Sequence, residues 1–179
     1  MCIFGTAVED MGTSVLFIVA LVLTICAVVF QIIGLAAPYW VFIDGSLFDT
    51  WYGLWTTCIK SQTATTCTSE DAKEDWERAV RAMSILGFLV LIVAVVMTVL
   101  KLFVMKDKKP VLFAGIGTSF AGGIFILIAV AVFAAKNKDV LAASGVNDFD
   151  YHFAFAFSII AMITAFAAGG VMLFGMMKE

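Results

Sequence analysis

The sequence predicts a mainly α-helical membrane protein, a left-handed bundle of four transmembrane helices that carries a small antiparallel β-sheet outside the membrane. Of the 179 residues, 63% are apolar and only 14% are charged, whereas charged residues make up about 25% of a typical soluble domain. Four windows contain no charged residue, and each is close to the roughly 20 helical residues that cross a hydrocarbon layer about 30 Å thick. A segment rich in aromatic and β-branched residues separates the first two windows and predicts the sheet.

The four charge-free windows are residues 14–36, 82–100, 111–135 and 153–177. They predict helices over about 14–36, 79–104, 111–135 and 152–177. The first window has an alternative interpretation as a cleaved signal peptide, because Leu35-Ala36-Ala37 offers small residues to a peptidase. A retained helix is favoured, since the apolar run is too long and its leader carries Glu9 and Asp10 without Lys or Arg. No linker or repeat divides the chain, so residues 1–179 are expected to form one domain.

Basic residues and cysteines together predict the topology. Four lysines crowd the short link between the second and third helices, which indicates a cytoplasmic link: Lys101, Lys106, Lys108 and Lys109. Basic residues in the other links weaken this signal, but Cys58 and Cys67 lie in the long first link, where a disulfide requires an oxidising compartment. Both termini are therefore expected in the cytoplasm, with extracellular loops over about 37–78 and 136–151.

The first loop has the composition of strands. Residues 39–43, 47–55 and 63–68 are rich in aromatic and β-branched side chains, and Asp44-Gly45-Ser46 predicts a turn between the first two. Thr68 followed by Asp71 resembles a capping box, so residues 71–81 are expected to form a short helix that runs into the second transmembrane helix.

Small residues recur at spacings of four in the third and fourth windows: Gly115, Ser119 and Gly123, then Ala161, Ala165 and Gly169. Such spacing places small side chains on one helical face, where two backbones can approach closely. The pattern fits either packing within the monomer or a face for lateral self-association.

One constellation in the first loop carries most information: Trp40, Gly53-Leu54-Trp55, Cys58 and Cys67. A bond between the two cysteines closes a short loop, which stabilises the fold by roughly 2.5 to 3 kcal/mol through loop-closure entropy. Each tryptophan offers a large apolar ring with one polar N–H, which suits the boundary between water and lipid. Gly53 allows a close backbone approach or an unusual backbone angle.

This constellation resembles the signature of the claudins and of their relatives, the peripheral myelin protein and epithelial membrane protein group. The likeness spans essentially the whole chain, and Arg81 stands where the family has an arginine before the second helix. Gly169-Gly170 resembles claudins, whereas Trp76 and residues 148–155 resemble the myelin and epithelial group, so the subgroup stays open. The short interval between Trp40 and Trp55, the end of the chain at Lys178-Glu179 and the absence of an Asn-x-Ser/Thr sequon depart from the family patterns. Scaffold binding through the C-terminus and an N-glycan are therefore not expected.

The resemblance implies a structural and adhesive protein of cell–cell junctions in the plasma membrane, which forms or regulates a paracellular barrier or pore. Its expected partners are the lipid bilayer and copies of itself or related claudin-like proteins, in cis and in trans. Two alternatives are an auxiliary subunit that modulates a channel or receptor, and a myelin-type organiser of membrane apposition. Five apolar loop residues are candidates for contacts with other protomers, although packing at the lipid edge explains them equally well: Val41, Phe42, Val140, Leu141 and Phe149.

No enzyme activity, cofactor, metal site or nucleic-acid binding is expected. The single histidine, His152, lies among aromatic residues at the start of a predicted helix, where anchoring at the membrane interface is the simpler role. Four clustered carboxylates lack the spacing and glycine of a calcium loop: Glu70, Asp71, Glu74 and Asp75. A transporter is disfavoured because the four windows contain no ionisable group.

Overall fold

The computed structural model describes residues 3–45, 47–105, 108–146 and 148–178, with side chains from Ser14 onward. Ser46 of the predicted turn and Lys106 of the basic link lie outside these residues. The helices are α1 (Ile3–Ala36), α2 (Asp75–Val99), α3 (Lys109–Ala143) and α4 (Phe153–Lys178), and α2 continues as a π-helical turn, η1 (Leu100–Val104). The strands are β1 (Val41–Ile43), β2 (Asp49–Tyr52), β3 (Thr56–Lys60), β4 (Thr65–Ser69) and β5 (Asp150–Tyr151).

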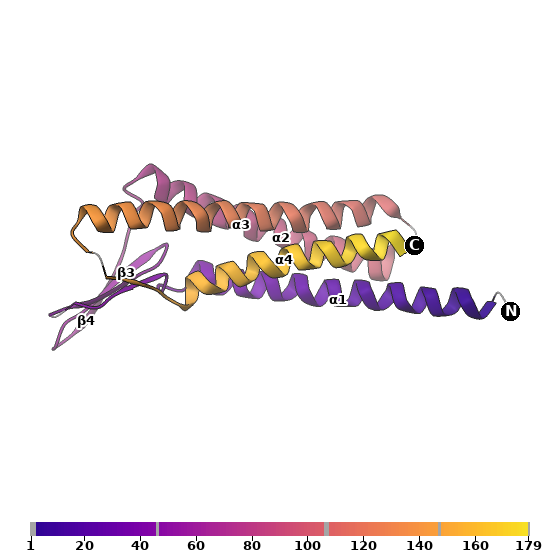
Figure 1. The fold of residues 1–179 in the computed structure, drawn as a ribbon, viewed down its shortest axis with the longest axis horizontal. Helices are drawn as coiled ribbons and strands as arrows, with labels where there is room; N and C mark the ends of the chain where they lie inside the picture. The colour runs from indigo at the N-terminus through magenta and orange to yellow at the C-terminus, as the bar shows by residue number, and fades with distance from the viewer. Residues whose placement is uncertain (1–2, 46, 106–107, 147, 179) are drawn as a thin grey trace.

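The four helices lie side by side, and the sheet projects from one end of the bundle while both chain termini lie at the other (Figure 1). α2 packs against α3, α1 against α4, and α3 against α4. This arrangement confirms the predicted mainly α fold with four long apolar helices and a small antiparallel sheet.

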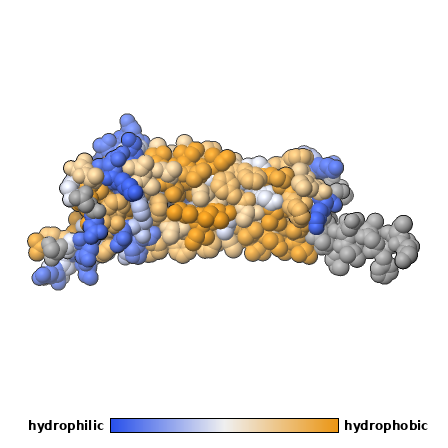
Figure 2. Space-filling view, viewed as in Figure 1, coloured by the Kyte–Doolittle hydropathy of each residue, from blue (hydrophilic) through white to orange (hydrophobic). Residues whose placement is uncertain are grey.

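All four helices are long and apolar enough to cross a membrane. Figure 2 shows an apolar band across the middle of the visible face of the bundle, with hydrophilic residues at the sheet end and at the opposite end. Large aliphatic side chains such as Val15, Leu89 and Ile163 are exposed on the band, whereas Ala20, Ala94 and other small residues are buried between helices. Apolar atoms outside and small residues inside are the pattern of a bundle solvated by lipid. The protein is therefore a multi-pass membrane protein.

Gly123 and Gly169, one from each ladder of small residues, pack against aromatic rings of the neighbouring helix inside the monomer. A Cβ added to Gly123 would lie 2.8 Å from the Phe166 ring, and one added to Gly169 would lie 2.9 Å from the Phe120 ring. The close approach of α3 and α4 thus depends on these glycines, which supports packing within the monomer as the role of the ladders.

The sheet is antiparallel throughout, with the strand order β4-β3-β2-β1-β5. Sequence reasoning was wrong to expect one strand over residues 47–55, because the backbone N–H of Gly53 donates to the Thr56 carbonyl at 3.0 Å and turns the chain from β2 into β3. It also missed β3 and β5. β5 comes from the link between α3 and α4 and pairs with β1, with Val41 opposite Tyr151.

The start of α2 also differs from the expectation. Thr68 belongs to β4, where it pairs with Thr57, so it does not cap a helix. The capping box is formed by Glu74 and Glu77, and the helix begins at Asp75 instead of near residue 71. The expected boundary of α3 was also short, since the helix continues past residue 135 to Ala143.

Candidate functional site

Trp40 satisfies a carbonyl that the end of α1 leaves without a helical donor. Residue 38 is proline, which has no N–H, so the carbonyl of Gly34 lacks its usual partner four residues along the helix. The indole Nε1 of Trp40 donates to this carbonyl at 2.6 Å. The Trp40 ring is fully buried and packs edge-on against Phe133 and Phe155, with centroids 4.7 and 5.5 Å away.

Trp55 likewise donates an indole hydrogen bond to the next carbonyl at the end of α1, that of Leu35. Its Nε1 donates to Leu35 at 2.8 Å, and the Arg81 guanidinium lies over its ring, 4.9 Å from the centroid. Arg81 Nη2 also donates to the Glu70 carbonyl at 2.8 Å, and Glu70 N–H donates to the Trp55 carbonyl at 2.9 Å. α1, the β2–β3 turn and the segment before α2 are thereby joined through one indole and one guanidinium.

Gly53 and Leu54 seat the β2–β3 turn on the bundle. A Cβ on Gly53 would lie 2.6 Å from the Ala37 carbonyl oxygen and 2.7 Å from Pro38 Cα, which are backbone atoms that cannot move aside easily. Leu54 is buried in the core. The Gly-Leu-Trp triplet therefore provides a close approach, an apolar anchor and a helix cap in three successive residues.

The disulfide between Cys58 and Cys67 is formed, as predicted. The two residues lie directly opposite each other on β3 and β4. Cys58 is buried, whereas every residue of β4 is exposed. The bond therefore fastens an exposed edge strand to the rest of the sheet.

Two of the candidate protomer contacts were wrong. Val41 and Leu141 are buried in the protein's own core, because β1 lies against the helices and α3 extends past the predicted boundary. Phe42 is partly buried near His152, with ring centroids 6.3 Å apart, and Phe149 packs edge-on against Tyr151 at 5.5 Å. Val140 is 46% exposed and stays a candidate.

A buried polar pair at the sheet end was missed by sequence reasoning. The Tyr52 hydroxyl donates to Asn137 Oδ1 at 2.5 Å, and Asn137 is only 3% exposed. Burial raises the pKa of Tyr52 to about 12. The effect of burial is larger than that of the Asn137 hydrogen bond, which lowers the pKa. Asn137 stands between two lysines in the sequence, which is typical of a solvated loop, so no local signal marked it as buried.

Polar groups are also buried within the helices. Gln31 is 1% exposed, and its Nε2 donates to the Ser84 carbonyl at 3.4 Å. Lys101, at the end of the second span, lies over the Phe17 ring, 5.4 Å from the centroid. Within the part of the chain that the structure describes, no three His, Cys, Asp or Glu side chains are grouped to hold a metal ion.

These features define a class: a four-helix, multi-pass membrane protein whose disulfide-bonded sheet is locked to one end of the bundle by two tryptophans and an arginine. The chain belongs to the PMP-22/EMP/MP20/Claudin family, whose model matches residues 11–173. A comparison with curated proteins found no significant match.

Proposed function

We propose that the protein is a claudin-like structural and adhesive component of cell–cell junctions in the plasma membrane, where it forms or regulates a paracellular barrier or pore. The observation that carries the proposal is the rigid attachment of the sheet through Trp40, Trp55 and Arg81. A sheet that is fixed to a membrane bundle holds its loops at a defined height and orientation, as contacts with neighbouring molecules require. Membership of the PMP-22/EMP/MP20/Claudin family supports this role.

The sheet end is assigned to the outside of the cell. A disulfide persists in an oxidising compartment, and Cys58–Cys67 lies in this part of the molecule. Lys101, Lys108 and Lys109 lie at the other end, where basic residues favour the cytoplasm. Both termini then lie in the cytoplasm.

The surfaces offered to neighbours are an edge strand and an apolar turn. Among the described strands, β4 pairs only with β3, and it is exposed along its length, so one row of its backbone groups is open to another strand. Leu47 and Phe48, between β1 and β2, are exposed away from the core. Exposed strand edges and apolar side chains of this kind support assembly with copies of the chain or with related proteins.

Expression in epithelial cells that lack junctional strands tests the proposal. The wild-type protein is expected to form intramembrane strands in freeze-fracture images and to change transepithelial resistance and dilution potential. Cys58→Ser, which frees β4, is the control and is expected to lower both effects at equal surface expression. Surface-expressed wild-type protein that forms no strands and leaves resistance unchanged contradicts the junctional role, and a stable co-purifying channel or receptor would then favour an auxiliary subunit.

A further inference from the structure

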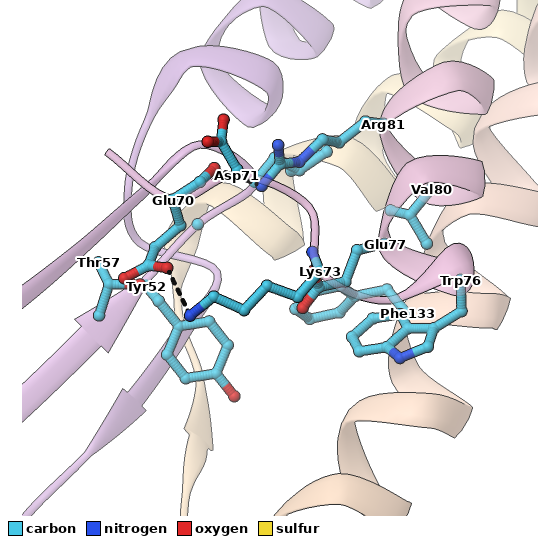
Figure 3. A pocket seen from close by; sticks show the side chains of 12 residues that line it. Tyr52, Thr57, Glu70, Asp71, Lys73, Trp76, Glu77, Val80, Arg81 and Phe133 are labelled. Atoms are coloured by element: carbon cyan, nitrogen blue, oxygen red, sulfur yellow. Dashed lines mark hydrogen bonds and ion pairs between the residues drawn. The ribbon is translucent and has the colours of Figure 1, made fainter. Parts of the chain in front are cut away.

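A cavity of about 160 Å³ lies at the sheet end of the bundle, between the β2–β3 turn, the segment before α2, and α3 (Figure 3). One water molecule needs only about 10–15 Å³ of such volume, so the cavity is large enough for a group of several heavy atoms. The known signature does not explain it, because only Gly53, Leu54 and Arg81 of that signature contribute to its lining.

The inner wall of the cavity is aromatic. Tyr52, Trp76 and Phe133 line it, and the last two meet edge-on with centroids 6.2 Å apart. Phe133 is buried, and the Tyr52 hydroxyl is occupied by Asn137, so these rings are held in place. Aromatic rings attract a cation through their negative faces, so a wall of three aromatic residues suits a cationic ligand.

The rim carries both signs of charge. Glu70 and Lys73 form an ion pair of 3.4 Å across the mouth, and the Lys73 side chain is 79% exposed, so this pair is weak and easily rearranged. The Asp71 carboxylate makes no hydrogen bond or ion pair with any residue in the described ranges. Arg81 uses Nη2 for the Glu70 carbonyl, which leaves other N–H groups of its fork for a ligand. Carboxylates beside an aromatic wall, with a lysine and an arginine next to them, complement a zwitterion.

The cavity lies where the membrane meets water. Trp76 is in the first turn of α2, among Asp75, Glu77 and Arg78, and the charge-free span begins at Ala82. Tryptophan is enriched at this level of a membrane, beside the lipid headgroups. The hydrophilic residues at the sheet end border the apolar band in the same region (Figure 2).

We propose that this cavity binds the phosphocholine headgroup of a membrane lipid. The trimethylammonium group lies against Trp76, Phe133 and Tyr52, near the Glu70 carboxylate, and the phosphate accepts hydrogen bonds from Lys73 and Arg81. Phosphocholine fits better than phosphoethanolamine because a methylated ammonium has no N–H to satisfy and is bound well by ring faces. Binding at this site does not depend on the proposed junctional role.

The full-length protein in nanodiscs tests the site. The discs contain phosphatidylcholine, phosphatidylethanolamine and phosphatidylglycerol in equal amounts, with the same acyl chains in both leaflets, so the result does not depend on orientation. The protein is then extracted into a maltoside detergent, and native mass spectrometry identifies the lipids it retains. We expect phosphatidylcholine to be enriched, and Trp76→Leu to lower its retention by about 3- to 30-fold, the range for loss of one cation–π contact.

Trp51→Leu is the matched control, because Trp51 stacks on Tyr39 outside the cavity, with centroids 5.8 Å apart, and its loss should leave the selectivity intact. Glu70→Gln and Lys73→Gln each remove one partner of a weak, solvent-exposed ion pair, so they carry the test even if Trp76→Leu does not fold. Each is expected to lower retention by about 1.5- to 5-fold, as is usual for exposed charges.

Two outcomes overturn the proposal. One is retention of the three lipids in their starting proportions. The other is retention of phosphatidylcholine at the wild-type level by all three single variants, Trp76→Leu, Glu70→Gln and Lys73→Gln. A titration with free phosphocholine separates the sources of the ligand: tight binding of the free headgroup without selectivity among lipids identifies a site for a soluble ligand and contradicts the lipid assignment.

Discussion

Trp40 and Trp55 donate their indole N–H groups to consecutive carbonyls, those of Gly34 and Leu35, at the end of α1. The two tryptophans come from different parts of the first loop, yet they close the same helix terminus. A helix end leaves carbonyls without intrahelical donors, and burying such groups without partners costs free energy. In this chain, Trp40 and Trp55 thus cap the end of a transmembrane helix beneath the β-sheet.

Replacing the buried cap is predicted to destabilise the protein. Trp40→Phe keeps an aromatic ring but leaves the Gly34 carbonyl buried without a donor, at a cost of about 1–3 kcal/mol in free energy of unfolding. Thermal unfolding in detergent measures the effect. Trp51→Phe, on a half-buried strand position without an indole hydrogen bond to a described residue, is the control. Equal melting temperatures for Trp40→Phe and wild type would show that the cap is dispensable.

Gly53→Ala is predicted to be strongly destabilising, because the new methyl group meets backbone atoms of Ala37 and Pro38 at 2.6–2.7 Å. Gly170→Ala is the matched control, since an added Cβ there meets none of the described residues within 4 Å. In a helix, this control should be neutral or stabilising by up to about 1 kcal/mol. Thermal stability by size-exclusion chromatography compares the two variants. A Gly53→Ala protein as stable as Gly170→Ala would contradict the close approach.

Arg81→Lys is predicted to lower stability by about 1–2 kcal/mol, because lysine cannot both stack on Trp55 and donate to the Glu70 carbonyl in the geometry of the guanidinium. Arg78→Lys provides the comparison: Arg78 is 64% exposed and pairs with Asp75, and exposed pairs contribute little. Chemical denaturation of both variants in the same detergent gives the difference. If the two substitutions lower the free energy of unfolding equally, the contacts of Arg81 contribute no more to stability than the exposed pair of Arg78 does.

Removing the disulfide is predicted to cost roughly 2.5 to 3 kcal/mol and to release β4. Cys58→Ser with Cys67→Ser tests this without leaving a lone thiol in the sheet, and Cys26→Ala, within α1, controls for the loss of a cysteine elsewhere. Hydrogen exchange of β4 amides is the readout. Protection of β4 that is unchanged in the double variant would mean that strand pairing alone holds the edge.

Tyr52 makes stability depend on pH in the alkaline range. Its pKa is raised by burial from 10.0 to about 12, so the folded protein keeps a proton that the unfolded chain loses. The contribution is fully present below pH 10 and is lost as pH rises to about 12, by an amount on the order of 2–3 kcal/mol. Unfolding free energies of wild type and Tyr52→Phe, measured across this range, should converge as pH rises. Parallel curves would contradict the assignment.

The sequence was sufficient for features with a local signal. Charge-free runs predicted the four helices, and the position of Cys58 and Cys67 in the long first loop predicted their disulfide. The two-residue strand β5 and the burial of Asn137 arise from contacts between segments far apart in the chain, so no local pattern marks them. Thr68 failed as a cap for the same reason, because its pairing with Thr57 in the sheet prevailed over a local capping pattern. The aromatic cavity likewise needed Tyr52, Trp76 and Phe133 to be brought together from three elements.

The central claim is that the bundle holds a cross-linked sheet on the outer side of the cell. Intact cells treated with a membrane-impermeant amine reagent, followed by mass spectrometry of the unreduced protein, test it most directly. The account predicts a peptide linked through Cys58 and Cys67, with Lys60 labelled and with Lys108 and Lys109 unlabelled until the membrane is opened. Free thiols at both cysteines, or labelling of Lys108 and Lys109 but not Lys60 in sealed cells, would contradict it.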